Sequence, residues 1–126
     1  MHLPMLSLKD IKTYFALFPT VKARLVGFNS PSYGRVEVHY SGLWGRVCGY
    51  NWNIQDAQVI CRMLAYSHVV AAGGSRHYGK GNVPIWIHST QCTGKEENIE
   101  NCPHKGWEVH DCTNGEAWVI CLNSSG

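Results

Sequence analysis

The sequence predicts a small α+β domain stapled by disulfides, with mostly antiparallel β-structure around one main helix. The 126-residue chain has the length of a single domain. It contains six cysteines, an even number typical of a disulfide framework. Short segments of alternating apolar and polar residues surround one amphipathic segment with helical spacing.

The cysteines indicate an oxidising compartment. They are separated by 12, 30, 9, 9 and 8 residues and occupy positions Cys48, Cys61, Cys92, Cys102, Cys112 and Cys121. Structural zinc sites usually contain close pairs such as Cys-x2-Cys, and none occurs here, so disulfides are favoured over zinc. Spacing alone leaves 15 connectivities open.

Composition excludes several classes of protein. The net charge of +2, from 11 basic and 9 acidic side chains, argues against a nucleic-acid binder. The chain contains no apolar run long enough for a transmembrane helix. Charged residues make up only 16% of the chain while glycines number 13, which favours a loop-rich β protein over a helical bundle.

Residues 1–22 differ from the rest of the chain. Leu8, Ile11 and Phe15 fall on one face at helical spacing, and Pro19 would end such a helix. We expect an upstream linker or vector-derived segment, with a short amphipathic helix as the alternative. No signal peptide is recognisable, so we expect a fragment or an incomplete gene model. The domain itself is predicted to span residues 23–122, followed by a tail at 123–126.

The alternation of apolar residues predicts the secondary structure of the domain. The best helix begins after Asn53, which can cap it, with Asp56 at the third helical position. A helical turn is expected at Glu96–Glu100, and a Gly-rich loop at Gly73–Gly81. The predicted helix is Ile54–Leu64, and the predicted strands are Ala23–Val26, Gly34–Tyr40, Leu43–Cys48, Val69–Ala72, Ile85–Ile87 and Ala117–Leu122.

These elements carry a family pattern. Ordered matches run through Arg24–Gly27, Gly34–Val38, Leu43–Cys48, Trp52, Ala57, Val59–Leu64, Gly79–Gly81, Pro84–Trp86, Gln91–Gly94, Asn101–Trp107, His110–Cys112 and Val119–Cys121. With all six cysteines included, the chain resembles a scavenger receptor cysteine-rich (SRCR) domain over residues 23–122. One group of this family has an extra cysteine pair, and Ser32 and Tyr66 stand near its positions here. The resemblance is therefore to the six-cysteine group A type.

The resemblance implies a fold and a pairing of the cysteines. The expected fold is a curved antiparallel sheet cradling the main helix, with long C-terminal loops. The implied disulfides are Cys48–Cys112, Cys61–Cys121 and Cys92–Cys102. Two of them would close long loops, and each such bridge stabilises by about 3–5 kcal/mol in the chain-entropy model.

Many domains of this family bind calcium through carboxylates at three places, and this sequence departs from that pattern. Gly49 and Tyr50 replace the paired aspartates, and Asn53 stands where another aspartate often follows Trp52. His88 and Ser89 occupy the acidic positions before Cys92, and Glu116 is the one acid left near the last cluster. Calcium needs six to eight oxygen ligands, several of them charged. We therefore expect no calcium site and no other cofactor.

Histidine suggests two alternatives. His88 with Glu116 and Asn53 forms a weak candidate for a transition-metal site, and a histidine pH switch is the other. Ligand spacing supports neither alternative, and Glu116 is expected to be an ordinary surface acid. His39 is expected to be solvated, and His104 and His110 to be structural.

Ligand contacts are predicted at a basic patch with aromatic neighbours. Arg46, Arg76 and Lys80 are the predicted contact patch, because arginine and lysine pair with sulfate, phosphate or carboxylate. Scattered solvated charges are the alternative. Tyr50 and Trp118 are further candidates, Trp118 either filling a gap or exposing an aromatic contact. The other tryptophans, Trp44, Trp52, Trp86 and Trp107, are expected in the core.

The resemblance implies a non-catalytic extracellular module, secreted or in a membrane-protein ectodomain, that recognises polyanionic, microbial or protein ligands. No nucleophile elbow or phosphate loop is recognisable. The alternatives are an accessory domain of a larger protease or amine oxidase and an adhesion or structural module in a tandem array. Membrane contact would come only through a parent protein. Asn123 begins a glycosylation sequon.

Overall fold

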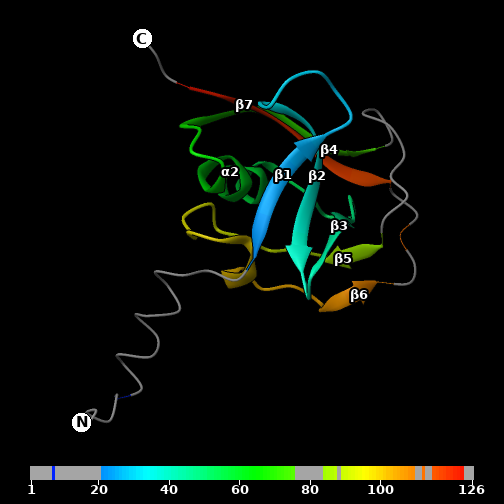
Figure 1. The fold of residues 1–126 in the computed structure, drawn as a ribbon. Coiled ribbons are helices and arrows are strands. Elements are labelled where there is room, and N and C mark those ends of the chain that lie inside the picture. The colour runs from blue at the N-terminus through cyan, green and yellow to red at the C-terminus, as the bar shows by residue number, and fades with distance from the viewer. Residues whose placement is uncertain are drawn as a thin grey trace, which may run out of the picture.

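The computed structural model describes Ser7 and residues 21–75, 84–87, 89–109, 112 and 115–123, and Figure 1 shows their arrangement. The predicted linker or helix at 1–22 lies outside these residues except for Ser7, Val21 and Lys22, of which Val21 is buried in the core and Lys22 begins β1. The part of the Gly-rich loop after Ser75 lies outside them as well. In the described residues, no helix is long and apolar enough to cross a membrane.

Within the described residues seven strands form one sheet, and the expected α+β fold is confirmed. The order is β4-β7-β2-β3-β5-β6, with β1 also pairing with β2. The strands are β1 (Lys22–Val26), β2 (Tyr33–Tyr40), β3 (Leu43–Val47), β4 (His68–Ser75), β5 (Ile85–Ile87), β6 (Trp107–Val109) and β7 (Glu116–Leu122). All pairs are antiparallel except β3 with β5, so the described sheet is mostly antiparallel, as the sequence predicted, with one parallel pair.

The central strand β2 explains how distant segments become neighbours. Arg35 pairs with Val26 of β1 and with Trp118 of β7. Two residues later, Glu37 pairs with Arg24 of β1 and with Arg46 of β3. One edge of β2 therefore carries β1, and the other edge is shared by β7 and β3. An isolated bridge between Cys48 and Glu116 then joins the end of β3 to the start of β7.

The main helix, α2 (Ile54–Met63), forms as the sequence predicts, ending one residue earlier. The Asn53 side chain accepts hydrogen bonds from the backbone N–H groups of Gln55 and Asp56, while the Asp56 carboxylate accepts one from Asn53 N. This capping box satisfies backbone donors that an open helix end would leave unpaired. The helix packs against β4, β7 and β1.

The core lies between α2 and the inner face of the sheet. Strand alternation points Val36, Val38, Val47 and Val119 inward, and each is almost fully buried. Ala57, Val59, Ile60 and Cys61 of α2 meet them. The predicted core tryptophans divide into two sets. Trp52 and Trp86 are buried and Trp107 packs against the core, whereas Trp44 lies half-buried on the opposite, outer face.

The three disulfides join the pairs that the resemblance implied. Cys48–Cys112 and Cys61–Cys121 connect residues 64 and 60 positions apart, and Cys92–Cys102 closes a ring over 10 positions. Cys61–Cys121 links α2 directly to β7. The two long-range bridges thus fix the helix and the end of β3 to the C-terminal part of the chain.

Two glycines explain why the predicted end of the strand that became β4 was wrong. The predicted loop at Gly73 and Gly74 is part of β4, where these residues pair with Trp118 and Ala117. A Cβ at Gly74 would collide with the carbonyl oxygen of Gly49, and one at Gly73 would lie 3.0 Å from the Trp118 ring. These glycines therefore allow close packing within a strand, whereas the sequence suggested a turn.

Two shorter elements also differ from the sequence prediction. The turn expected at Glu96–Glu100 is the 3-10 helix η1 (Ile99–Asn101). Strand β6 (Trp107–Val109) was not predicted from the sequence.

Candidate functional site

The outer face of the sheet gathers charged and aromatic side chains from four strands. Alternation and register place ten such residues on this face, which are Lys22, Arg24, Tyr33, Arg35, Glu37, His39, Trp44, Arg46, Glu116 and Trp118. We call this set the outer face. Four of its members are basic and two are acidic, which leaves a net charge of +2 with His39 neutral.

Glu37 is buried on the outer face because two arginines cover it. Arg24 donates to Glu37 Oε1 from Nε and Nη2 at 3.0 and 2.7 Å, and Arg35 approaches Oε2 at 3.5 Å. The Arg24 guanidinium also lies 4.1 Å from the centroid of the Trp44 ring. The Arg24 side chain nevertheless remains 44% exposed while that of Glu37 is 4% exposed. This cluster therefore presents positive charge to solvent over a buried carboxylate.

Arg46 and Glu116 form a second ion pair, beside the end of β3. Arg46 Nη1 lies 2.9 Å from Glu116 Oε1, and the two side chains are 20% and 4% exposed. The prediction that Glu116 is a surface acid was wrong, because pairing across the junction of β3 and β7 buries it. Arg46 was predicted as a ligand contact, and its guanidinium pairs with Glu116 within the domain.

The positions where the resemblance implies calcium ligands do meet in the fold. Gly49 N donates to Gly115 O at 2.8 Å, and Cys48 N to Ile87 O at 3.0 Å. These bonds bring the segments after Cys48, before Cys92 and before Cys121 together. In the described part of these segments the donor set does not fit calcium, since its carboxylate, Glu116, already binds a guanidinium.

Asn53, a weak metal candidate, is occupied as the N-cap of α2. His88, Arg76, Lys80 and His110 lie outside the described residues. Tyr50 is 44% exposed, and Asn123 of the sequon is exposed. Trp118 fills the space above Gly73 and is half-buried, as the gap-filling alternative proposed.

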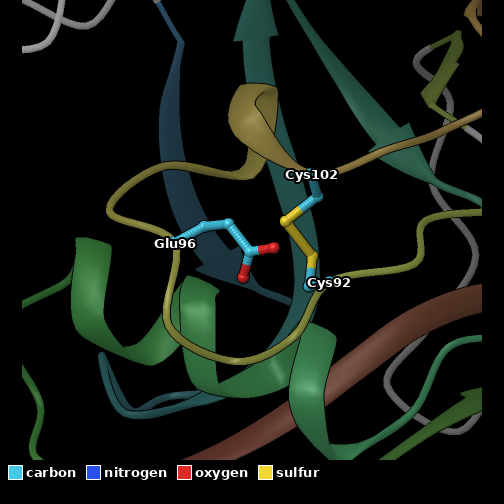
Figure 2. A group of neighbouring side chains, drawn as sticks. All are labelled: Cys92, Glu96 and Cys102. Carbon is cyan, nitrogen blue, oxygen red and sulfur yellow. A yellow bond between two sulfur atoms is a disulfide. The ribbon is translucent and has the colours of Figure 1, made fainter.

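One group of potential metal ligands occurs among the described residues: Cys92, Glu96 and Cys102 have ligand atoms within 4.8 Å of one another. Figure 2 shows the Glu96 carboxylate beside the bond that joins the two sulfurs. Because disulfide sulfurs are not thiolates, this group lacks the ligands that a metal would need.

The Glu96 carboxylate instead closes a local turn. It accepts hydrogen bonds from the backbone N–H groups of Thr93 and Gly94 and from the Thr93 hydroxyl, all at 3.0–3.1 Å. These bonds, the one from Thr93 N foremost, hold the pKa of Glu96 below its usual value.

Asp56 connects the helix cap to the same loop. Its Oδ1 accepts from Cys92 N at 2.9 Å, and its Oδ2 accepts from Asn53 N at 3.0 Å. Burial raises the pKa of Asp56, and the hydrogen bonds to backbone N–H groups oppose that rise. The sequence indicated the cap but gave no sign of the bond to Cys92, which lies 36 residues away.

Comparisons with known proteins identify the family. The sequence model of the scavenger receptor cysteine-rich domain matches residues 26–122. This chain belongs to the SRCR family. It is 41% identical over 106 residues to the macrophage scavenger receptor types I and II of Mus musculus, covering 83% of this chain and 23% of the relative. It is 43% identical over 99 residues to an SRCR superfamily protein of Patiria pectinifera, covering 78% and 9%.

Solved SRCR structures share the fold. The third SRCR domain of murine neurotrypsin superposes with a TM-score of 0.73 at 34% identity, covering 83% of this chain and 99% of that one. The SRCR domain of mouse MARCO, in its dimeric form, gives a TM-score of 0.64 at 40% identity, covering 71% and 85%. The chain spans less than a quarter of the length of the two curated relatives. The family supports a ligand-binding module, and SRCR domains of scavenger receptors are extracellular and non-enzymatic.

Proposed function

We propose that this SRCR domain is a non-catalytic extracellular recognition module that binds polyanionic surfaces through the outer face of its sheet. The observation that carries the proposal is the burial of both carboxylates on that face. Glu37 and Glu116 are each 3% exposed, whereas Lys22 and Arg24 are exposed. A polyanion approaching this face would therefore meet mostly positive charge.

The contacts of Arg24 suit it to this role. Its guanidinium is fixed by Glu37 and by the Trp44 ring, so little side-chain entropy is lost when a ligand binds. Sequence reasoning chose Arg46, Arg76 and Lys80 and missed Arg24. The available signal was the alternation in the predicted strand Ala23–Val26, where Arg24 stands between Ala23 and Leu25, which pack against the core.

We further propose that recognition does not use a calcium ion. The Arg46–Glu116 pair supports this, because a guanidinium cation takes the place beside the carboxylate that a metal cation would need. Fixed protein charge would then replace bound metal charge at this end of the sheet.

An accessory role within a longer protein is the second candidate. The chain covers only 9% and 23% of its curated relatives, and the similar neurotrypsin domain is the third SRCR domain of its protein. An accessory domain of a secreted or membrane-bound enzyme, or an adhesion module in a tandem array, could use the same face.

Heparin chromatography over a salt gradient tests the outer face. We expect Arg24→Gln to weaken retention by about threefold in apparent affinity, since exposed ion pairs contribute modestly and are screened by salt. The matched control is Lys105→Gln, which removes one exposed positive charge from the loop before β6. Equal retention of the two variants, with native near-UV circular dichroism, would contradict the proposed face.

A further inference from the structure

A polar pocket lies on the helix side of the domain, away from the outer face. It has a volume of about 370 Å³ and is formed by α2, the turn that leads into β4 and the loop after Cys92. Figure 1 shows α2 nearly end-on, with this loop in yellow beside it. The side chains that matter to its chemistry are Gln58, Arg62, Tyr66, His68, Thr93 and Lys95.

The charged side chains that line the pocket are basic. Arg62 and Lys95 both line it, and the described residues that line it include no aspartate or glutamate. Glu96 is the nearest acid along the loop. Its carboxylate is turned onto the backbone N–H groups of Thr93 and Gly94, beside the Cys92–Cys102 disulfide in Figure 2. The pocket therefore has two basic side chains in its lining, and the Glu96 carboxylate lies behind the loop, bound to backbone N–H groups.

Backbone carbonyls hold Arg62 in place. Its Nη1 donates to Glu96 O at 2.7 Å and its Nη2 to Gly94 O at 2.8 Å. These bonds orient the guanidinium without neutralising it, and they use two of its five N–H donors. Arg62 can thus keep both its charge and further donors for a ligand.

The loop that carries Lys95 is also fixed. Gly94 has a φ of +97°, and a Cβ there would collide with the Gln58 amide oxygen. Lys95 N donates to the Thr93 hydroxyl at 3.2 Å. This packing sets the distance between loop and helix, so the pocket is preformed.

We propose that this pocket binds one anionic sugar residue, with Arg62 and Lys95 contacting its sulfate or carboxylate group. The volume falls within the range of about 300–1,000 Å³ that is usual for small-molecule sites, which leaves room for a ring as well as an oxyanion. Gln58 and Thr93 supply neutral polar groups for hydroxyls, and Tyr66 supplies an aromatic surface. The inference deepens the proposed polyanion recognition by adding a second contact on the opposite side.

NMR titration of the ¹⁵N-labelled chain tests the site. The probes are glucosamine 6-sulfate and N-acetylneuraminic acid in separate arms, with neutral N-acetylglucosamine as control. We expect saturable shifts at the Ser67, His68 and Gly94 amides with at least one anionic probe and not with the neutral one. The arm that responds identifies sulfate or carboxylate as the group bound. No saturable shift with either anionic probe would overturn the proposal.

Matched variants test the pocket and the outer face independently of each other. Lys95→Gln is expected to weaken binding of the anionic sugar by about fivefold, while Lys105→Gln and Arg24→Gln leave it unchanged. Arg62→Gln should weaken it further. Lys95→Gln keeps the test decisive if loss of the Arg62 contacts prevents folding. Unchanged affinity in Lys95→Gln would refute the pocket, whereas unchanged heparin retention in Arg24→Gln would refute only the outer face.

Discussion

The outer face and the helix-side pocket hold their arginines in opposite ways. On the outer face, Arg24 and Arg46 bind carboxylates, those of Glu37 and Glu116. On the helix side, Arg62 binds backbone carbonyls, those of Glu96 and Gly94. The nearby acids Asp56 and Glu96 likewise bind backbone N–H groups, and neither forms an ion pair with another described residue.

This difference shows that a count of basic residues does not locate a ligand surface. A carboxylate partner fixes an arginine but cancels its charge at a distance, whereas a carbonyl partner fixes it and leaves the charge in place. The outer face therefore offers a broad, partly compensated field suited to an extended polymer. The pocket places Arg62 and Lys95 side by side in its lining, with the Glu96 carboxylate behind the loop, and so suits one anionic group.

The largest expected effect is on the helix side, at Asp56. Asp56→Asn should lower the free energy of unfolding by about 2 kcal/mol, because an amide cannot accept both backbone N–H bonds and one donor loses its partner. Urea denaturation of variant and wild type measures the loss. The exposed acid Glu97 provides the control, and Glu97→Gln should be nearly neutral.

The same variant makes a pH prediction. Burial raises the folded-state pKa of Asp56 above 3.8, so the folded state binds more protons than the unfolded state between those two values. The contribution of Asp56 to stability is therefore greater at low pH and falls as pH rises through the folded pKa. The difference in unfolding free energy between wild type and Asp56→Asn should shrink over that window. If the difference in unfolding free energy grew with pH instead, burial would not be what dominates the pKa of Asp56.

A smaller effect is expected on the outer face, at Glu116. Glu116→Gln should cost about 1 kcal/mol, because Arg46 is partly exposed and can recruit water when its carboxylate is replaced. A double-mutant cycle with Arg46→Met isolates the coupling between the two side chains. A coupling energy of zero would mean that the Arg46–Glu116 pair adds nothing to stability. The comparison between carboxylate-bound and carbonyl-bound arginines would then have no energetic basis.

The smallest expected effect is that of calcium. Millimolar calcium should shift the melting temperature of this domain by less than about 1 °C, since a ligand that binds only the folded state would stabilise it by mass action. Glu116→Gln in the same buffers is the control. A shift of several degrees in the wild type, reversed by chelator and absent in the variant, would show that calcium competes with Arg46.

Local patterns in the sequence predicted most elements to within a residue or two. The helix cap at Asn53 and the alternation of Val36 and Val38 are encoded by neighbours in the chain, and both occur as predicted. The family pattern added the disulfide pairs, which spacing could not choose. Strand β6 was missed. The parallel pairing of β3 with β5 was missed as well, because these strands lie about 40 residues apart and local patterns do not report which distant strands pair.

The sequence by itself determined the fold class, the inward and outward faces of β2, and the loss of the family's acidic residues after Cys48. Only the tertiary structure decided which charges remain available. Arg46 and Glu116 are 70 residues apart, and Arg62 lies 32 and 34 residues from the carbonyls that hold it. The physical reason is that periodicity and capping act between residues close in the chain, whereas charge compensation depends on which distant strands and loops the fold brings together.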